Sequence, residues 1–122
     1  MTDFYKFQTP GDSIEFKILS FKSTLNGYAI EAKTTSGTGT VTLIGMTDGI
    51  TKVFKQAKRI IKNHGVYNLK YCLTLIDKES TKNSGIYFNF KLLIIAGSEK
   101  YEFDTKEFPE ISFDELIELI DK

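Results

Sequence analysis

The chain has 122 residues, 41% of them hydrophobic, with equal numbers of acidic and basic residues. This length fits one domain with a real core, and no apolar run is long enough to predict a membrane span. One cysteine, Cys72, excludes an intramolecular disulfide, and the first residues lack the apolar segment of a secretion signal. We therefore expect a cytoplasmic protein.

The zero net charge hides an asymmetry along the chain. Residues 1–98 carry thirteen Lys or Arg against seven acids, whereas residues 99–122 carry nine acids against three lysines. We expect the first range to be a folded domain with an N-terminal arm and the second to be an acidic C-terminal segment. A basic body favours a polyanionic partner, although charges also segregate by chance in small proteins.

The first strand is predicted to be bent. Residues 1–11 form an aromatic-rich arm that ends in a turn. Residues 13–25 then alternate between apolar and polar, but the phase of the alternation slips after Ile18. A slip of one residue indicates a β-bulge, which bends a strand so that a sheet can close on itself.

A β-hairpin follows this strand. Residues 26–27 are Asn-Gly, the strongest short-range signal for a two-residue turn. The register that this turn implies sets Lys22 opposite Glu31 and Ser20 opposite Lys33, on the face away from the core. The hairpin is therefore predicted to be apolar inside and charged outside.

One helix is predicted between the third and fourth strands. The second and third strands cover residues 28–35 and 41–46. Residues 51–65 then repeat apolar side chains at helical spacing, with Thr51 as the expected N-cap and Gly65 as the stop. The other side of this helix is basic, which is typical of a solvated face.

Two long strands complete the predicted domain. Residues 67–77 and 86–96 alternate apolar and polar side chains around a polar loop. Both faces are apolar from Leu92 to Ala96, so we expect the acidic segment or a second subunit to cover that end. The chain is thus predicted to form a homo-oligomer, a dimer by default or a tetramer.

A short helix is predicted near the C-terminus. Residues 112–121 begin with a capping box made by Ser112 and Glu115 and continue with an apolar stripe. This helix either packs on its own domain or docks a protein partner.

The order of elements predicts a mainly β fold, a five-stranded OB-fold Greek-key barrel with one helix between strands 3 and 4. The opening strand GDSIEFKILSF, the Asn-Gly hairpin, the helix at 51–64 and the strands around the loop at 78–85 resemble single-stranded DNA-binding proteins. They are most similar to the small variant OB-fold type made by bacteriophages. The bacterial type ends in an acidic peptide closing on Pro-Phe, whereas this chain ends LIELIDK.

The resemblance implies sequence-independent binding and protection of single-stranded DNA during replication or recombination, in the host cytoplasm if the protein comes from a phage. It also implies a replication or recombination protein as partner of the acidic segment. Two alternatives stay open: an RNA-binding OB domain, and a β-barrel adaptor that binds proteins and no nucleic acid.

Single-strand binding needs cations along the phosphates and aromatic faces for the bases. We expect these roles to fall on outward-facing side chains of the strands and of the last loop, together with Tyr28, an inward ring at the hairpin end that can still be half exposed. The candidates are Lys22, Tyr28, Lys33, Lys70, Lys82, Tyr87, Asn89 and Lys91. Tyr87 is the best stacking candidate because its neighbours on the strand face are polar, whereas core packing is the favoured alternative for Tyr28.

No enzymatic activity, cofactor or metal is expected. The single histidine, His64, stands at a predicted helix end, where a cation interacts favourably with the helix dipole. We see no cluster of carboxylates that would hold a metal, and the glycines of the loop at 34–40 lack the spacing and lysine of a phosphate-binding loop.

Overall fold

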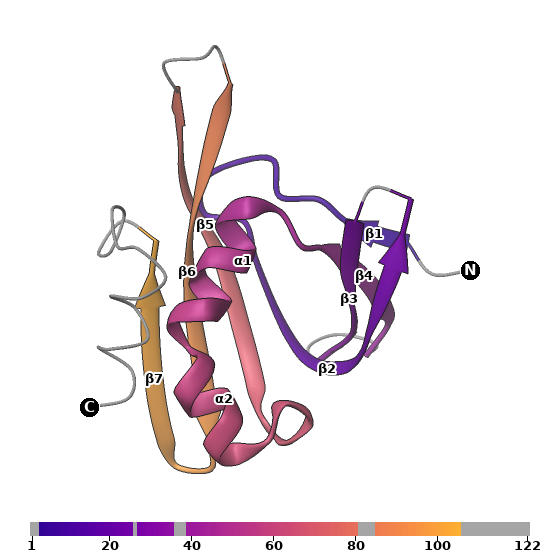
Figure 1. Ribbon diagram of the computed structural model, residues 1–122, viewed down its shortest axis with the longest axis vertical. Helices are drawn as coiled ribbons and strands as arrows, with labels where there is room; N and C mark the ends of the chain where they lie inside the picture. The colour runs from indigo at the N-terminus through magenta and orange to yellow at the C-terminus, as the bar shows by residue number, and fades with distance from the viewer. Residues whose placement is uncertain (1–2, 26, 36–38, 81–84, 106–122) are drawn as a thin grey trace.

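A computed structural model describes residues 3–25, 27–35, 39–80 and 85–105 (Figure 1). Its strands and helices follow one another in the order β1 (Asp3–Tyr5), β2 (Ser13–Thr24), β3 (Gly27–Thr34), β4 (Val41–Gly45), α1 (Asp48–Gln56), α2 (Lys58–His64), β5 (Lys70–Ser80), β6 (Ile86–Ala96) and β7 (Glu99–Asp104). A short 3-10 helix, Val66–Asn68, leads into β5. The prediction of a mainly β protein is confirmed.

The strands form one open sheet in the order β1-β4-β3-β2-β5-β6-β7. Only the β1–β4 pair is parallel among these neighbours. Three consecutive strands, β2 to β4, are paired in series, and β5 returns through the helices to lie beside β2. This spatial order, β5-β2-β3-β4, is a Greek key.

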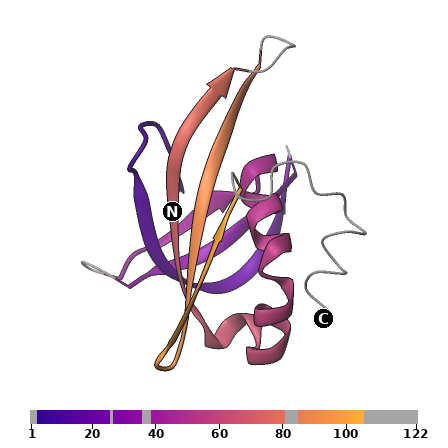
Figure 2. The ribbon, with the colours of Figure 1, turned by 90° about the vertical axis from the view of Figure 1, so that its left-hand side faces the viewer.

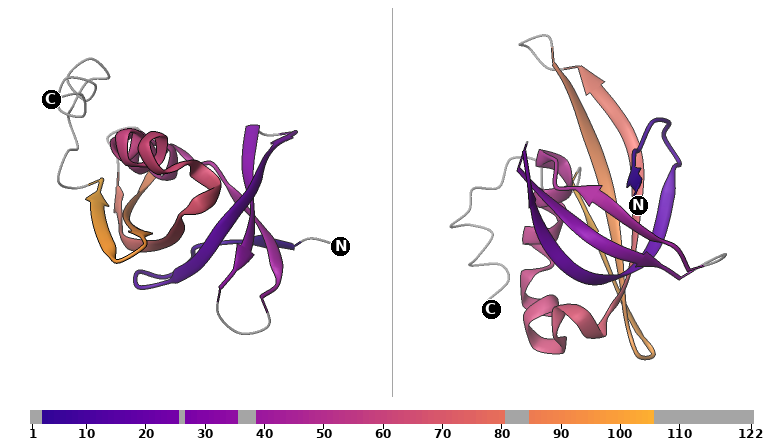
Figure 3. Two further views of the ribbon diagram at one scale, coloured as in Figure 1. Left: turned by 90° about the horizontal axis from the view of Figure 1, so that it is seen from below. Right: turned by 90° about the vertical axis from the view of Figure 1, so that its right-hand side faces the viewer.

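The sheet curves around its core, as two perpendicular views show (Figures 2 and 3). Strands β2 to β4 and strands β5 to β7 lie on different sides, and both helices run along the β5–β7 side. The strands β4 and β6 are not paired with each other; β1 lies beside β4 and β7 beside β6. The described sheet therefore does not close into a five-stranded barrel.

The predicted bulge in the first strand is confirmed. The register between β2 and β3 shifts between Ile18 and Ser20, which leaves Leu19 unpaired. A second shift, between Leu75 and Asp77 in β5, was not expected, although the adjacent apolar residues Leu75 and Ile76 interrupt the alternation there. Both bulges bend long strands, so the sheet can curve around the helices.

The hairpin register differs from the prediction by two residues. Thr24 pairs with Gly27, and Lys22 lies opposite Ala29 instead of Glu31. Beyond the unpaired Leu19 the bulge adds one more residue, so Lys17 rather than Ser20 lies opposite Lys33. A shift of two residues preserves the alternation of side chains, so the predicted faces remain correct. The cause is the position of the turn. The strands pair from Thr24 and Gly27, one residue earlier in the sequence than an Asn-Gly turn at 26–27 predicts.

The single predicted helix is two helices. The first begins earlier than expected, after Thr47 in extended conformation, and the break falls at Ala57. There the amide of Ala57 donates to the carbonyl of Phe54, a tighter turn than the α-helix makes. Ala57 is fully buried, so tertiary packing overrides its high helix propensity. The predicted end is confirmed, because Gly65 has φ +86°.

The core lies between the helices and the inner face of the sheet. Its largest fully buried side chains include Phe16 from β2, Tyr71 from β5 and Phe90 from β6. The rings of Phe16 and Tyr71 stack with centroids 5.6 Å apart, and burial raises the pKa of Tyr71 far above its usual range. The predicted C-terminal helix at 112–121 lies outside the described residues.

Candidate nucleic-acid interface

The lysines proposed from the sequence share the outer face of the sheet, which lies away from the core. Lys22 pairs with Ala29 and Lys33 with Lys17 across β2 and β3, while Lys70 and Lys91 lie on β5 and β6. Inner-face residues of the same strands, such as Tyr71 and Leu92, are buried. Because side chains alternate along a strand, all four predicted lysines point outward.

Three of these lysines face acids on the same surface. The Lys22 ammonium lies 3.0 Å from a Glu31 carboxylate oxygen, and Lys91 lies 3.1 Å from Glu102. Lys70 approaches Glu15 at 3.8 Å. The hydrogen bond from Lys22, and a weaker one from Ser20, hold the pKa of the Glu31 carboxyl below its usual value. The outer face is thus a mosaic of both charges rather than a uniformly basic groove.

The exception is the pair Lys17 and Lys33. These residues lie directly opposite each other across β2 and β3, and both are exposed. Directly opposed side chains in an antiparallel pair have Cβ atoms about 5 Å apart, and like charges at that distance destabilise the sheet. A bound anion would remove this repulsion. Sequence reasoning missed Lys17 because the expected register placed Ser20 opposite Lys33.

Two exposed aromatic rings lie toward the other end of β3, near the β2–β3 hairpin and β1. Tyr28 of β3 is 68% exposed and Phe4 of β1 is 52% exposed, so Tyr28 is not a core residue. Phe4 pairs with Leu43 of β4 and stands on the outer face. Sequence reasoning treated Phe4 only as part of the arm, because nothing in the sequence indicated which strand the arm would join.

The expected exposure of Asn89 is wrong. This side chain is 3% exposed and donates from its amide nitrogen to Asp77 at 2.9 Å. Its oxygen accepts from the hydroxyl of Thr105 at 3.0 Å, and the same hydroxyl accepts from the amide of Phe90. Thr105 follows β7, so these hydrogen bonds make Asn89 a structural link between β5, β6 and the end of β7.

Two of the predicted site residues cannot be placed. Lys82 lies outside the described residues. The backbone of Tyr87 pairs with Glu79 in the β5–β6 hairpin, but its side chain is outside the described part of the structure. The proposed stacking role of Tyr87 therefore stays a prediction.

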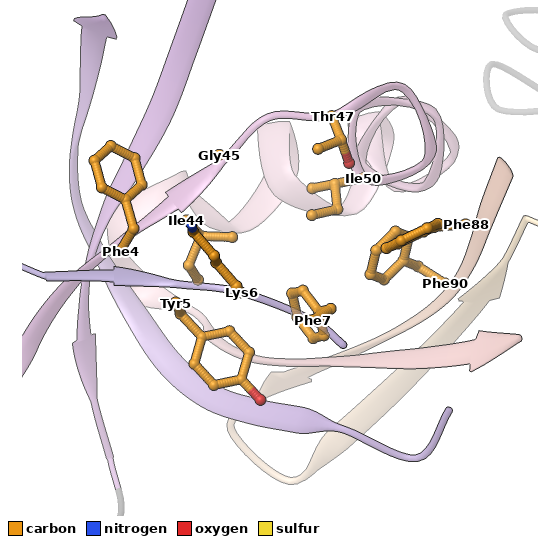
Figure 4. A pocket seen from close by; sticks show the side chains of 10 residues that line it. All are labelled: Phe4, Tyr5, Lys6, Phe7, Ile44, Gly45, Thr47, Ile50, Phe88 and Phe90. Atoms are coloured by element: carbon orange, nitrogen blue, oxygen red, sulfur yellow. The ribbon is translucent and has the colours of Figure 1, made fainter. Parts of the chain in front are cut away.

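The N-terminal arm fills the space between β4 and β6. Figure 4 shows Phe7 pointing toward Phe90, and their rings meet edge to face at 5.0 Å. An apolar cavity of about 340 Å³ remains beside them, lined by residues of the arm, β4, α1 and β6. The Tyr5 hydroxyl donates to the Ser13 carbonyl, and burial, with a smaller contribution from Asp12, raises the pKa of Tyr5.

The described residues were also compared with the requirements of a metal site and of a membrane span. Within them, no three His, Cys, Asp or Glu side chains gather as a metal site would require. None of the described helices has the length and apolar character needed to cross a bilayer. His64 is exposed at the end of α2, and its ring centroid lies 6.2 Å from that of Tyr101.

Comparison with known proteins identifies no class for this chain: no family model, curated protein or solved structure matches it.

Proposed function

We propose that the chain binds single-stranded nucleic acid across the outer face of β2 and β3, with DNA in replication or recombination as its ligand. The observation that carries the proposal is the opposed pair Lys17 and Lys33. Their repulsion disfavours the free protein and is relieved when a phosphate lies between them. Lys22 on the same face extends the path, because its exposed pair with Glu31 is weak enough to exchange for a phosphate.

The topology supports the same proposal. An OB-fold is a partly open Greek-key barrel that binds oligonucleotides on the face of its second and third strands. We interpret β2 to β6 as such a barrel, opened between β4 and β6, with the arm lying in the opening. Its second and third strands are then β3 and β4; β3 carries Lys33 and Tyr28, and β4 pairs with β1, which carries Phe4. The face of this barrel therefore adjoins the proposed path on β2 and β3 through their shared strand, β3.

The proposal is tested by fluorescence anisotropy with a labelled oligo-dT of about 30 nucleotides, its duplex and oligo-U of equal length, across a salt series. We expect the single strand to bind more tightly than the duplex, with affinity falling steeply as salt rises. The oligo-U arm separates DNA from RNA binding, because only RNA offers the 2′-hydroxyl.

The matched variants are K17Q/K33Q on the outer face and K58Q/K62Q on α2, which remove the same charge from opposite sides of the sheet. The first should lower the slope of log affinity against log salt by roughly 1.4, since each phosphate contact on a single strand contributes about 0.7. The second should leave the slope unchanged. Absence of single-strand binding at low salt, or equal loss in both variants, would contradict the proposal.

Docking of a protein is the second candidate. Leu25 and Ile86 are large apolar side chains left exposed at hairpin ends, and Leu93 and Ile95 lie half-buried on the outer face. This surface would also serve the proposed homo-oligomer. Light scattering of the purified chain measures its mass directly; a monomer at all concentrations would remove self-association as an explanation for these side chains.

A further inference from the structure

A hollow of about 780 Å³ lies where β1, β4 and the β2–β3 hairpin meet. Its walls are mostly apolar and include Phe4, Leu43, Tyr28 and Met46. One carboxylate, that of Asp48 at the start of α1, also lines it. The hollow adjoins the cavity beside Phe7, and Phe4, Gly45 and Thr47 border both.

Two exposed rings from different elements border this hollow. Phe4 is fixed by the pairing of β1 with Leu43, and its ring points away from Tyr5 and Phe7 (Figure 4). Tyr28 is fixed by its carbonyl, which accepts from the amide of Met46 at 2.9 Å. Each ring thus presents aromatic surface from a backbone position that is already ordered, so little conformational entropy is lost on binding.

We propose that this hollow receives one unpaired base of the bound strand, which stacks on Phe4 and Tyr28. The inference rests on the proposed function and adds the N-terminal arm to the binding surface. A base suits the hollow because it is flat and uncharged, and stacking on an aromatic ring does not depend on which base it is.

The charges around the hollow determine where the phosphates of the bound nucleic acid lie. Asp48 repels a phosphate, so only the uncharged part of a nucleotide enters. Lys22 lies across β3 from Gly45, another residue of the hollow's wall, through the cross-strand partners Lys22–Ala29 and Ala29–Gly45. Two strand spacings put Lys22 about 10 Å from Gly45. The phosphates therefore follow Lys22 and the lysine pair, while the base turns into the hollow.

The test compares F4A and Y28A with F21A. Phe21 is exposed to a similar degree, 48%, on the neighbouring strand but does not line the hollow. Each protein is titrated with oligo-dT and with an abasic oligonucleotide of equal length, which keeps the phosphates and lacks the bases. F4A and Y28A should each weaken binding of oligo-dT by roughly tenfold and leave abasic binding unchanged. F21A should match the wild type on both probes.

An oligonucleotide that carries 2-aminopurine gives an independent signal, because its fluorescence is quenched when it stacks. Quenching in the wild type that is lost in F4A supports the inference.

Binding of both probes by F4A and Y28A as in the wild type would overturn the inference while leaving the proposed function intact. Failure of the wild type to bind either probe would overturn the function itself. A change of oligomeric mass in F4A would show that a second copy covers the hollow, which also overturns the inference. F4L serves if F4A does not fold.

Discussion

Several lysines on the outer face form ion pairs with glutamates. The Lys22–Glu31 pair spans β2 and β3 at 3.0 Å, and the Lys22 side chain is 52% exposed. Exposed pairs of this kind contribute only about 0.2–1 kcal/mol to stability. Their greater consequence is for ligand binding, because a phosphate that reaches Lys22 has to displace Glu31.

Removing the charge of Glu31 should therefore strengthen binding. In E31Q, Lys22 loses its competing partner and the proposed path gains one net positive charge. We expect the affinity for oligo-dT at low salt to rise roughly two- to fivefold, the range that a weak exposed pair permits. The control is E102Q, which releases Lys91 far across the sheet from the lysine pair. An equal rise in E102Q would show that total charge, and not this path, governs binding.

The carboxylate of Asp12 organises the turn between the arm and β2. Its Oδ2 accepts from the amides of Thr9 and Gln8, each at 2.9 Å, and these bonds, the one from Thr9 first, lower its pKa. Since the folded protein favours the charged form, Asp12 stabilises the fold above its unfolded pKa of about 4. That contribution is lost as pH falls through the lowered value.

D12N keeps an acceptor at this turn and removes the titration. Thermal unfolding of the wild type and D12N should therefore show a difference in melting temperature at pH 7 that shrinks as the pH falls below about 4. The comparison cancels the effect of other acids such as Glu31, which both proteins share. A difference that stays constant down to pH 2.5 would show that the turn does not depend on this charge.

At the scale of elements, the start of α1 lies directly against β6. A Cβ built on Gly49 would come within 2.3 Å of the Phe88 carbonyl oxygen and 3.0 Å of the Phe90 ring. G49A should therefore push the helix off the strand and lower the free energy of unfolding by about 1–3 kcal/mol. In an open helix the same change would stabilise, because alanine has the higher helix propensity.

Chemical denaturation measures this effect, and G45A is its control. A Cβ at Gly45 would meet nothing within 4 Å, and this residue does not have positive φ. We expect G45A to be nearly neutral in stability. If G49A proved as stable as the wild type, the helix would have room to shift without loss of packing.

The sequence predicted elements best where a short-range signal decides them. The alternation of Ile14, Phe16 and Ile18 and the slip that follows located the bend of β2, and Gly65 located the end of α2. The break at Ala57 carries no such signal, because alanine is the best helix former. Ala57 is fully buried in the core, a property that its local sequence does not reveal.

For the candidate site, the sequence predicted only which side chains alternate onto the outer face of the strands. The outward positions of Lys22 and Lys33 followed from the strand period, but the pairing of Lys33 with Lys17 depended on where the turn begins. The exposure of Asn89 was misjudged because the residue that covers it, Thr105, follows a later strand, β7. Phe4 was overlooked because a short arm can join either edge of a sheet, and sequence period does not choose between them.

At the scale of the whole molecule, the described sheet has an opening between β4 and β6 that the arm occupies. β1 pairs with β4 on one side, while Phe7 reaches Phe90 of β6 on the other. The rings of Tyr5 and Phe7 also meet edge to face at 4.8 Å. Such aromatic pairs contribute about 0.5–1.5 kcal/mol beyond their buried area. Side-chain packing on β6 thus adds to the backbone hydrogen bonds that join the arm to β4 and, at Gly11, to β5.

Phe7 should therefore matter to the stability of both halves. F7A is expected to lower the free energy of unfolding by about 2–3 kcal/mol, less than a fully buried phenylalanine would cost because Phe7 is half-buried. Hydrogen exchange should quicken in β4 and β6 together, since each loses the packing that bridges them. F4A is the control on the same arm: its ring points away from Phe90, so stability should change little. Faster exchange confined to the arm in F7A would mean that β4 and β6 hold their positions without it.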